Sequence, residues 1–169
     1  MNSAAHIVGE ITERIVVGRK TETRVQAVIW KAAAAGWQPV LLKDVGAENR
    51  AYDVNDAGQV AGNSSGNAVL WTPSDGLYGT PVIVHTSQGA LSKVDRWGRV
   101  VGYTSATTPS KRRAWVWENG VVTVLPFPTG AIATVATTIM IDLSTREGLI
   151  AGGGMQSGLA LVFNGEIYN

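Results

Sequence analysis

The sequence predicts an all-β protein built from repeated antiparallel units, and three observations support this prediction. The chain of 169 residues contains 20 glycines, and its apolar residues fall in short valine-rich runs. The one alanine run, residues 32–35, is too short to form a helix on its own. A pattern of short strands and turns recurs four times. We therefore expect antiparallel sheets and almost no helix.

The clearest copy of the unit lies at residues 51–84. Within it, Asn55-Asp56-Ala57-Gly58 suits a type I turn closed by a glycine with positive φ, which predicts a hairpin. A second turn is indicated by Asp75-Gly76. The four strands predicted from this copy, in up-and-down order, are residues 51–54, 59–62, 68–71 and 81–84.

Two independent alignments give four copies. The glycine that ends the second strand aligns Val17-Gly18, Ala61-Gly62, Val101-Gly102 and Ala151-Gly152. The third strand, with alanine three residues before an aromatic residue, aligns residues 27–30, 68–71, 114–117 and 160–163. The hairpin glycine has no counterpart at Arg14 in the first copy, so we expect that copy to turn at Thr12-Glu13. Residues 1–169 then form one repeat domain, with units at about 6–44, 50–86, 90–126 and 136–169.

The period and the third strand together predict how the units are arranged. Copies recur about every 40 to 50 residues, the period of a propeller blade. Alternation places Trp71 and Val69 on one face of the third strand and Ala68 and Leu70 on the other, so both faces are apolar. A strand that is apolar on both faces is typical of a sheet packed between two other sheets. The tryptophan on one face would pack against the small alanine on the facing side of the next sheet. We expect a β-propeller-like array of four four-stranded antiparallel blades.

At these residues the sequence resembles the HAF family of probable extracellular repeats. The matching positions in the second and third copies are Ala51, Val54, Asn55, Gly58, Val60, Gly62, Ala68 and Trp71, then Val94, Gly98, Val100, Val101, Gly102, Ala114 and Trp117. The naming His-Ala-Phe triplet keeps only its alanine here. The resemblance covers nearly the whole chain and implies a propeller-like fold. It implies no activity, because the shared motifs are structural.

Composition excludes several kinds of site. Without cysteine, the chain has no disulfide, no thiolate metal site and no cysteine nucleophile. His6 and His85 have no metal-spaced partner, so we expect ordinary surface histidines. No cofactor motif is present, and no cofactor is expected. The N-terminal segment lacks the features of a signal peptide, and no window approaches a membrane span, which favours a soluble cytoplasmic protein; secretion is the alternative if a leader was removed.

A charged residue precedes an apolar one in each of the four predicted first strands. The residues before Ile11, Val54, Val94 and Leu143 are Glu10, Asp53, Lys93 and Asp142. First strands line the axis of a propeller, so these side chains predict a ring around a channel that binds a hard cation or anchors water. The alternative is that they lie at the channel mouth and only pair with one another.

Basic residues concentrate in two connections between second and third strands. These connections contain six basic residues against one acidic residue, Glu22, although the net charge of the chain is only +1. The basic residues are Arg19, Lys20, Arg24, Lys111, Arg112 and Arg113. In a propeller these connections emerge on one face, which predicts a basic surface for an anionic ligand. The alternative is two solvated loops that aid solubility.

These features favour a non-catalytic binding or interaction module. The partner would be an anionic small molecule, an acidic glycan or a protein. Few aromatic residues accompany the basic ones, which disfavours nucleic acid. Alternatives are a hydrolase or lyase that uses axial carboxylates, and a purely structural assembly unit. The four blades could close alone, or two chains could join, because terminal blades leave apolar faces and strand edges bare.

Overall fold

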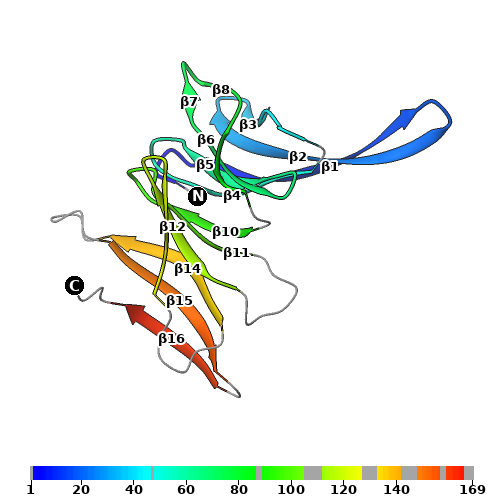
Figure 1. The fold of residues 1–169 in the computed structure, drawn as a ribbon. Coiled ribbons are helices and arrows are strands. Elements are labelled where there is room, and N and C mark those ends of the chain that lie inside the picture. Colours follow the sequence, from blue (N-terminus) through cyan, green and yellow to red (C-terminus); the bar gives the residue numbers. More distant parts are fainter. Residues whose placement is uncertain are drawn as a thin grey trace.

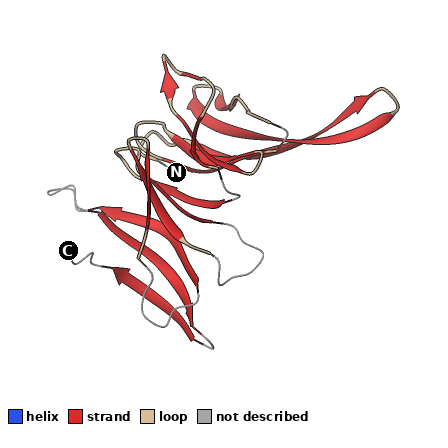
Figure 2. Cartoon of the chain, viewed as in Figure 1, coloured by secondary structure: helices blue, strands red, loops and turns tan. Residues whose placement is uncertain are grey.

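The computed structural model describes residues 2–46, 48–86, 89–104, 112–126, 133–141, 148–156 and 159–165, with side chains at 2–46, 48–86, 93–104 and 112–126. These residues form strands, turns and loops and contain no helix (Figure 2). The predicted all-β class is therefore confirmed for the described part of the chain.

Four antiparallel sheets follow one another along the chain. The first consists of β1 (Ile7–Val17), β2 (Lys20–Ala33) and β3 (Gly36–Leu41). The second consists of β4 (Asn49–Val54), β5 (Val60–Ser64), β6 (Asn67–Trp71) and β9 (Val82–His85), and a small ribbon of β7 (Pro73–Ser74) and β8 (Leu77–Tyr78) is inserted in it. The third consists of β10 (Gly89–Val94), β11 (Val100–Thr104), β12 (Ala114–Glu118) and β13 (Val121–Val124). The fourth consists of β14 (Ala133–Ile141), β15 (Gly148–Gln156) and β16 (Leu159–Gly165).

Each sheet packs against the next one in sequence (Figure 1). Strand β4 of the second sheet contacts β1 and β2 of the first. Strand β10 of the third sheet contacts β4, β5 and β6, and β14 of the fourth contacts β10, β11 and β12. The first strand of each later sheet therefore makes the junction with the sheet before it.

The first sheet differs from the predicted first copy. Strand β1 is continuous, so the expected turn at Thr12-Glu13 is wrong; the chain turns at Gly18, whose φ is +64°. Arg14 carries a Cβ and cannot take up such a φ without strain, and the extended strand continues through it. The outer part of this hairpin, residues 12–24, forms an arm that leaves the sheet (Figure 1).

Strand register also changes which glycine is equivalent in the first copy. Ile7 pairs with Trp30 as Val60 pairs with Trp71, so the counterpart of Gly62 is Gly9 and not Gly18. Strand β1 is thus the second strand of its unit. The first sheet contains the second, third and fourth strands of the repeat, and β1 lies at its edge.

The glycine at the end of the second strand faces a β-bulge. Gly62 pairs with Ala51, next to the bulge between Ala51 and Asp53. A Cβ on Gly62 would lie 2.1 Å from the Arg50 carbonyl oxygen and 2.5 Å from the Trp71 ring, which only glycine avoids. The same bulge recurs in the next two sheets. It lies between Leu91 and Lys93, where Leu91 pairs with Gly102, and between Ala136 and Thr138, where Ala136 pairs with Gly152. The predicted equivalence of Gly62, Gly102 and Gly152 is confirmed.

The third strand of the second sheet packs between its two neighbouring sheets as predicted. Trp71 is fully buried and lies in one apolar cluster with Ala27 and Ile29 of the first sheet, and its Nε1 donates a hydrogen bond to the Lys43 carbonyl oxygen at 2.7 Å. The opposite face of the second sheet forms the next cluster with the third sheet. That cluster contains Ala61, Ala68, Leu70, Val84, Val94, Val100 and Trp115, with Trp117 packed against it. A bulky indole therefore lies at each of these two junctions.

Polar turns join the same sheets at one end. Asn55 and Asp95 each accept, through Oδ1, a hydrogen bond from the backbone N–H four residues later, at 2.9 Å in both turns. Asn2 does the same for His6 at 2.8 Å. The three turns are equivalent by register. Each begins five residues before a second-strand residue, Ile7, Val60 or Val100, that pairs with a tryptophan of the third strand.

These turns are also linked from sheet to sheet. Asn2 donates through Nδ2 to the carbonyl oxygen of Asn55 at 2.7 Å, and Asn55 donates in the same way to Asp95 at 2.6 Å. We call this chain of Asn2, Asn55 and Asp95 the turn ladder. It ends at Asp95, because a carboxylate has no N–H to donate; its Oδ2 instead accepts from Arg99 Nε at 2.5 Å.

Candidate functional site

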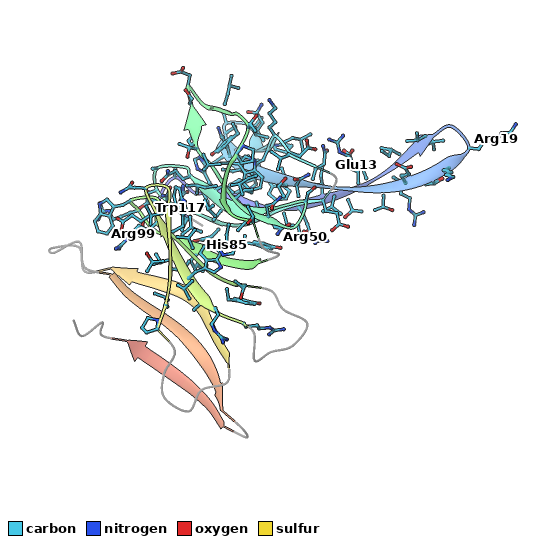
Figure 3. All side chains as sticks on the ribbon, in the orientation of Figure 1. Glu13, Arg19, Arg50, His85, Arg99 and Trp117 are labelled. Atoms are coloured by element: carbon cyan, nitrogen blue, oxygen red, sulfur yellow. The ribbon has the colours of Figure 1, made fainter. Side chains whose placement is uncertain are left out.

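The basic residues of the first connection lie along the arm. Arg19 is at its tip, remote from the stacked sheets (Figure 3), and Lys20 follows it. Arg24 forms an ion pair with Asp44, with 2.6 Å between Nη2 and Oδ2. Asp44 thus offsets the charge of Arg24, and Arg19 and Lys20 are the exposed basic pair of this connection.

The basic residues of the third sheet lie beside an aromatic ring. The guanidinium carbon of Arg112 lies 5.8 Å from the centre of the Tyr103 ring. Arg113 donates from Nη1 to the Arg112 carbonyl oxygen and from its backbone N–H to Thr104 Oγ1, both at 2.9 Å. Lys111 lies outside the described residues. The structure therefore brings Arg112 and Arg113 together at the start of β12.

Two described members of the predicted ring of charged residues pair with one another. Asp53 pairs with Lys93, with 3.4 Å between Oδ1 and Nζ, and its Oδ2 accepts from the Val94 N–H at 2.9 Å. Glu10 lies on β1, a second strand by register, and pairs with Arg50 at 2.7 Å. The equivalence of Glu10 to Asp53 is therefore wrong, since β1 supplies no first strand.

The fourth member of that ring also has another register position. In the fourth sheet Thr138 pairs with Ala151, as Asp53 pairs with Ala61 and Lys93 with Val101. Thr138 therefore takes the place that the sequence pattern gave to Asp142, which lies outside the described residues. Across the side chains that the structure describes, no group of three or more His, Cys, Asp or Glu residues gathers to hold a metal ion.

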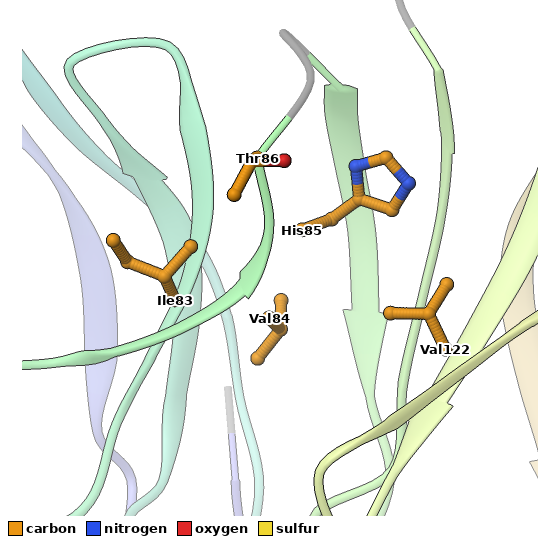
Figure 4. A pocket seen from close by; sticks show the side chains of 5 residues that line it. All are labelled: Ile83, Val84, His85, Thr86 and Val122. Atoms are coloured by element: carbon orange, nitrogen blue, oxygen red, sulfur yellow. The ribbon is translucent and has the colours of Figure 1, made fainter.

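A shallow pocket of about 210 Å³ lies between the outer strands of the second and third sheets (Figure 4). Its lining residues are Ile83, Val84, His85, Thr86 and Val122. The His85 ring stacks on the buried indole of Trp115, with 4.9 Å between ring centres and 17° between planes. The expectation of an ordinary surface histidine is therefore wrong for His85, because the sequence does not show that β9 brings it over Trp115.

A second pocket, of about 220 Å³, lies at the end of the third sheet that carries the turn ladder, and Trp97, Arg99, Glu118 and Asn119 line it. Asp95 is buried and holds Arg99 through Nε. The Trp97 ring lies 5.5 Å from the guanidinium carbons of both Arg96 and Arg99. This pocket could not be predicted from the sequence, because its residues come from separate turns.

Two pKa shifts lie at the turn ladder. Burial, and secondarily the positive charge of Lys31, lowers the pKa of His6 below its ordinary value. Its Nδ1 lies 3.1 Å from Asn2 Nδ2, an amide donor, so the contact requires a neutral ring with Nδ1 as the acceptor. The Ser3 N–H, which donates to Asp56 Oδ1 at 2.7 Å, lowers the pKa of that carboxyl.

The described residues include no helix that could cross a membrane. Comparison with protein-family models, curated proteins and solved structures gave no match.

Proposed function

We propose that the chain is a non-catalytic interaction module whose successive sheets are blades of a propeller-like array of the HAF-repeat type. The repeated first-strand bulge, the buried indoles between sheets and the turn ladder support the propeller-like arrangement, because they place each unit against the next in the same way. The carboxylates of Asp53 and Glu10 are engaged by Lys93 and Arg50, which favours an interaction module over an enzyme with free axial acids.

The partner that this module binds is a polyanion such as an acidic glycan. The observation that supports it most is the pair Arg112 and Arg113 in a connection between second and third strands, where Arg112 lies over the Tyr103 ring and Arg113 donates to the Arg112 carbonyl oxygen. The corresponding connection of the first sheet presents Arg19 and Lys20 at the arm tip. Arginine guanidinium groups suit carboxylate and sulfate groups, since their N–H donors form paired hydrogen bonds.

Titration of the chain with a sulfated oligosaccharide at several salt concentrations tests this proposal. Affinity should fall as salt rises, and the double variant Arg112→Gln, Arg113→Gln should bind about tenfold more weakly, as expected for the loss of two half-buried cationic contacts. Arg96→Gln is the matched control, because it removes an exposed charge at the other end of the same sheet. Salt-independent binding, or equal loss in the control, would contradict the proposal.

A further inference from the structure

We propose that the open edge of β1, at residues 7–11, binds an extended peptide strand from a partner protein. In the sheet order β1-β2-β3, one side of β1 is hydrogen-bonded to β2, and no strand of the described part of the chain pairs with its other side. The site is separate from the basic residues at the arm tip and at the start of β12, so this inference does not depend on the anionic partner.

The repeat shows what belongs on this edge. In the second sheet, β4 pairs with β5 along the edge that corresponds to the open edge of β1, and in the third sheet β10 pairs with β11 in the same way. By register, Ile7 and Gly9 correspond to Val60 and Gly62. Strand β1 therefore presents backbone N–H and C=O groups in the arrangement that elsewhere receives a bulged first strand.

Gly9 differs from Gly62 in what surrounds it. A Cβ on Gly62 would meet the Arg50 carbonyl oxygen at 2.1 Å and the Ala51 Cα at 3.1 Å, so the adjacent strand itself requires glycine there. A Cβ on Gly9 would meet only the Trp30 ring, with atoms at 3.2 and 3.6 Å, and Gly9 has no positive φ. Gly9 thus leaves the space that the backbone of an added strand occupies in the second sheet.

The edge is held in place before a partner arrives. The turn that leads into β1 is fixed by the hydrogen bonds from His6 N–H to Asn2 Oδ1 and from Asn2 Nδ2 to the Asn55 carbonyl oxygen. On its other side β1 pairs with β2 along its whole length. A rigid edge loses little conformational entropy on binding, which favours strand addition.

The first strands of the repeat define the partner's chemistry. In β4, Ala51 and Val54 are buried, each 5 % exposed, while Tyr52 between them is 44 % exposed. In β10 the corresponding residues are Leu91 and Val94, again three apart and separated by the bulge. The partner segment should therefore be an extended strand with two apolar residues three positions apart and polar residues between them.

A fluorescein-labelled peptide with the sequence of residues 49–54 is the probe, and anisotropy with the full chain is the readout. The wild type should bind it, and Gly9→Ala should weaken binding about tenfold or more, because displacing the bulge breaks one or two backbone hydrogen bonds. Gly79→Ala is the matched control, since a Cβ there meets nothing within 4 Å. A peptide N-methylated at its bulge should fail to bind.

Amide hydrogen exchange gives a readout that does not rely on a variant. In the presence of peptide, the β1 amides that point away from β2 should exchange more slowly, while those of the arm stay unchanged. Absence of binding to the wild type, or equal affinity of a folded Gly9→Ala variant, would overturn the proposal. If the chain is a dimer whose β1 amides are already protected and whose exchange does not change when peptide is added, the proposal is overturned and the edge pairs with a second copy of the chain.

Discussion

The side-chain amide of Asn55 donates a hydrogen bond to the carbonyl oxygen of Asp95 at 2.6 Å, and this bond joins equivalent turns of two successive sheets. Asn55 is only 6 % exposed, so its polar groups depend on protein partners rather than water. The apolar cluster between the same two sheets contains Trp115. Apolar burial and a directed polar contact therefore fix the same junction.

Replacement of Asn55 by aspartate should destabilise the fold by at least about 2 kcal/mol. In the wild type, the Asp95 carbonyl oxygen and Gln59 Oε1 both accept hydrogen bonds from Asn55 Nδ2. The change removes both N–H donors and places a carboxylate against these two oxygens. Urea unfolding measures the loss. Asn63→Asp is the control: Asn63 Oδ1 accepts from the Gly66 N–H, which a carboxylate also does, so its change should stay within about 0.5 kcal/mol. Equal effects in both variants would contradict a role for the turn ladder.

The two buried indoles should respond differently to phenylalanine. Trp71 donates to the Lys43 carbonyl oxygen, whereas Trp115 Nε1 is buried without a hydrogen-bond partner among the residues that the structure describes. Trp71→Phe should therefore cost about 1 to 2 kcal/mol more than Trp115→Phe in urea melts. A larger loss for Trp115→Phe would show that packing volume alone decides the effect.

Truncation and overpacking at the same junctions test the bulky and recessed faces. Trp71→Ala should cost about 3 to 5 kcal/mol because it leaves a cavity, and Ala68→Leu about 1 to 3 kcal/mol because Ala68 is fully buried in a filled cluster. Thermal and urea unfolding check both values. Neutral results for both variants would exclude stacking through these faces.

Stability should fall as acid protonates His6. The pKa of His6 in the folded state lies below its ordinary value of 6.5, so its contribution is fully present above pH 6.5 and is lost as pH falls through the folded pKa. The physical reason is that a protonated Nδ1 cannot accept from Asn2. Urea midpoints measured between pH 7.5 and 5 follow this loss.

His6→Gln is the matched variant for this pH effect. Gln59, the equivalent residue of the second unit, already accepts from Asn55 through Oε1 at 2.8 Å. The variant should keep the hydrogen bond and lose the part of the pH dependence that His6 contributes in this window. Asp56 does not confuse the result, because its pKa is lowered below 3.8 and its contribution is lost only at more acidic pH. An unchanged slope in the variant would contradict the assignment to His6.

Much of the fold could be predicted because local turn chemistry and long-range packing agree. Gly58 and Gly98 have positive φ at the predicted hairpin turns, and alternation along 68–71 placed Trp71 and Ala68 on the correct faces. Both signals depend only on neighbours in sequence. The bulge beside Gly62 could not be predicted from the sequence, because it depends on the register in which β4 pairs with β5.

The error in the first unit also has a physical origin. Val8-Gly9 and Val17-Gly18 both fit the pattern that ends the second strand, and Gly9 is the true counterpart of Gly62. In the other copies a turn glycine lies four residues before this position. Ala5 takes that place with a φ of 55°, so the turn has no glycine in sequence. The available signal was Asn2, which lies five residues before Ile7 as Asn55 lies before Val60. The same alignment wrongly assigned Glu10 to a first strand.

The most direct test of the stacked arrangement is a nuclear Overhauser measurement from the rings of Trp71 and Trp115. We predict cross-peaks from Trp71 to methyl groups of Ala27 or Ile29 in β2, and from Trp115 to those of Ala68 or Leu70 in β6. Such peaks place each indole against the sheet before its own. Cross-peaks confined to methyl groups of each ring's own sheet would contradict the arrangement.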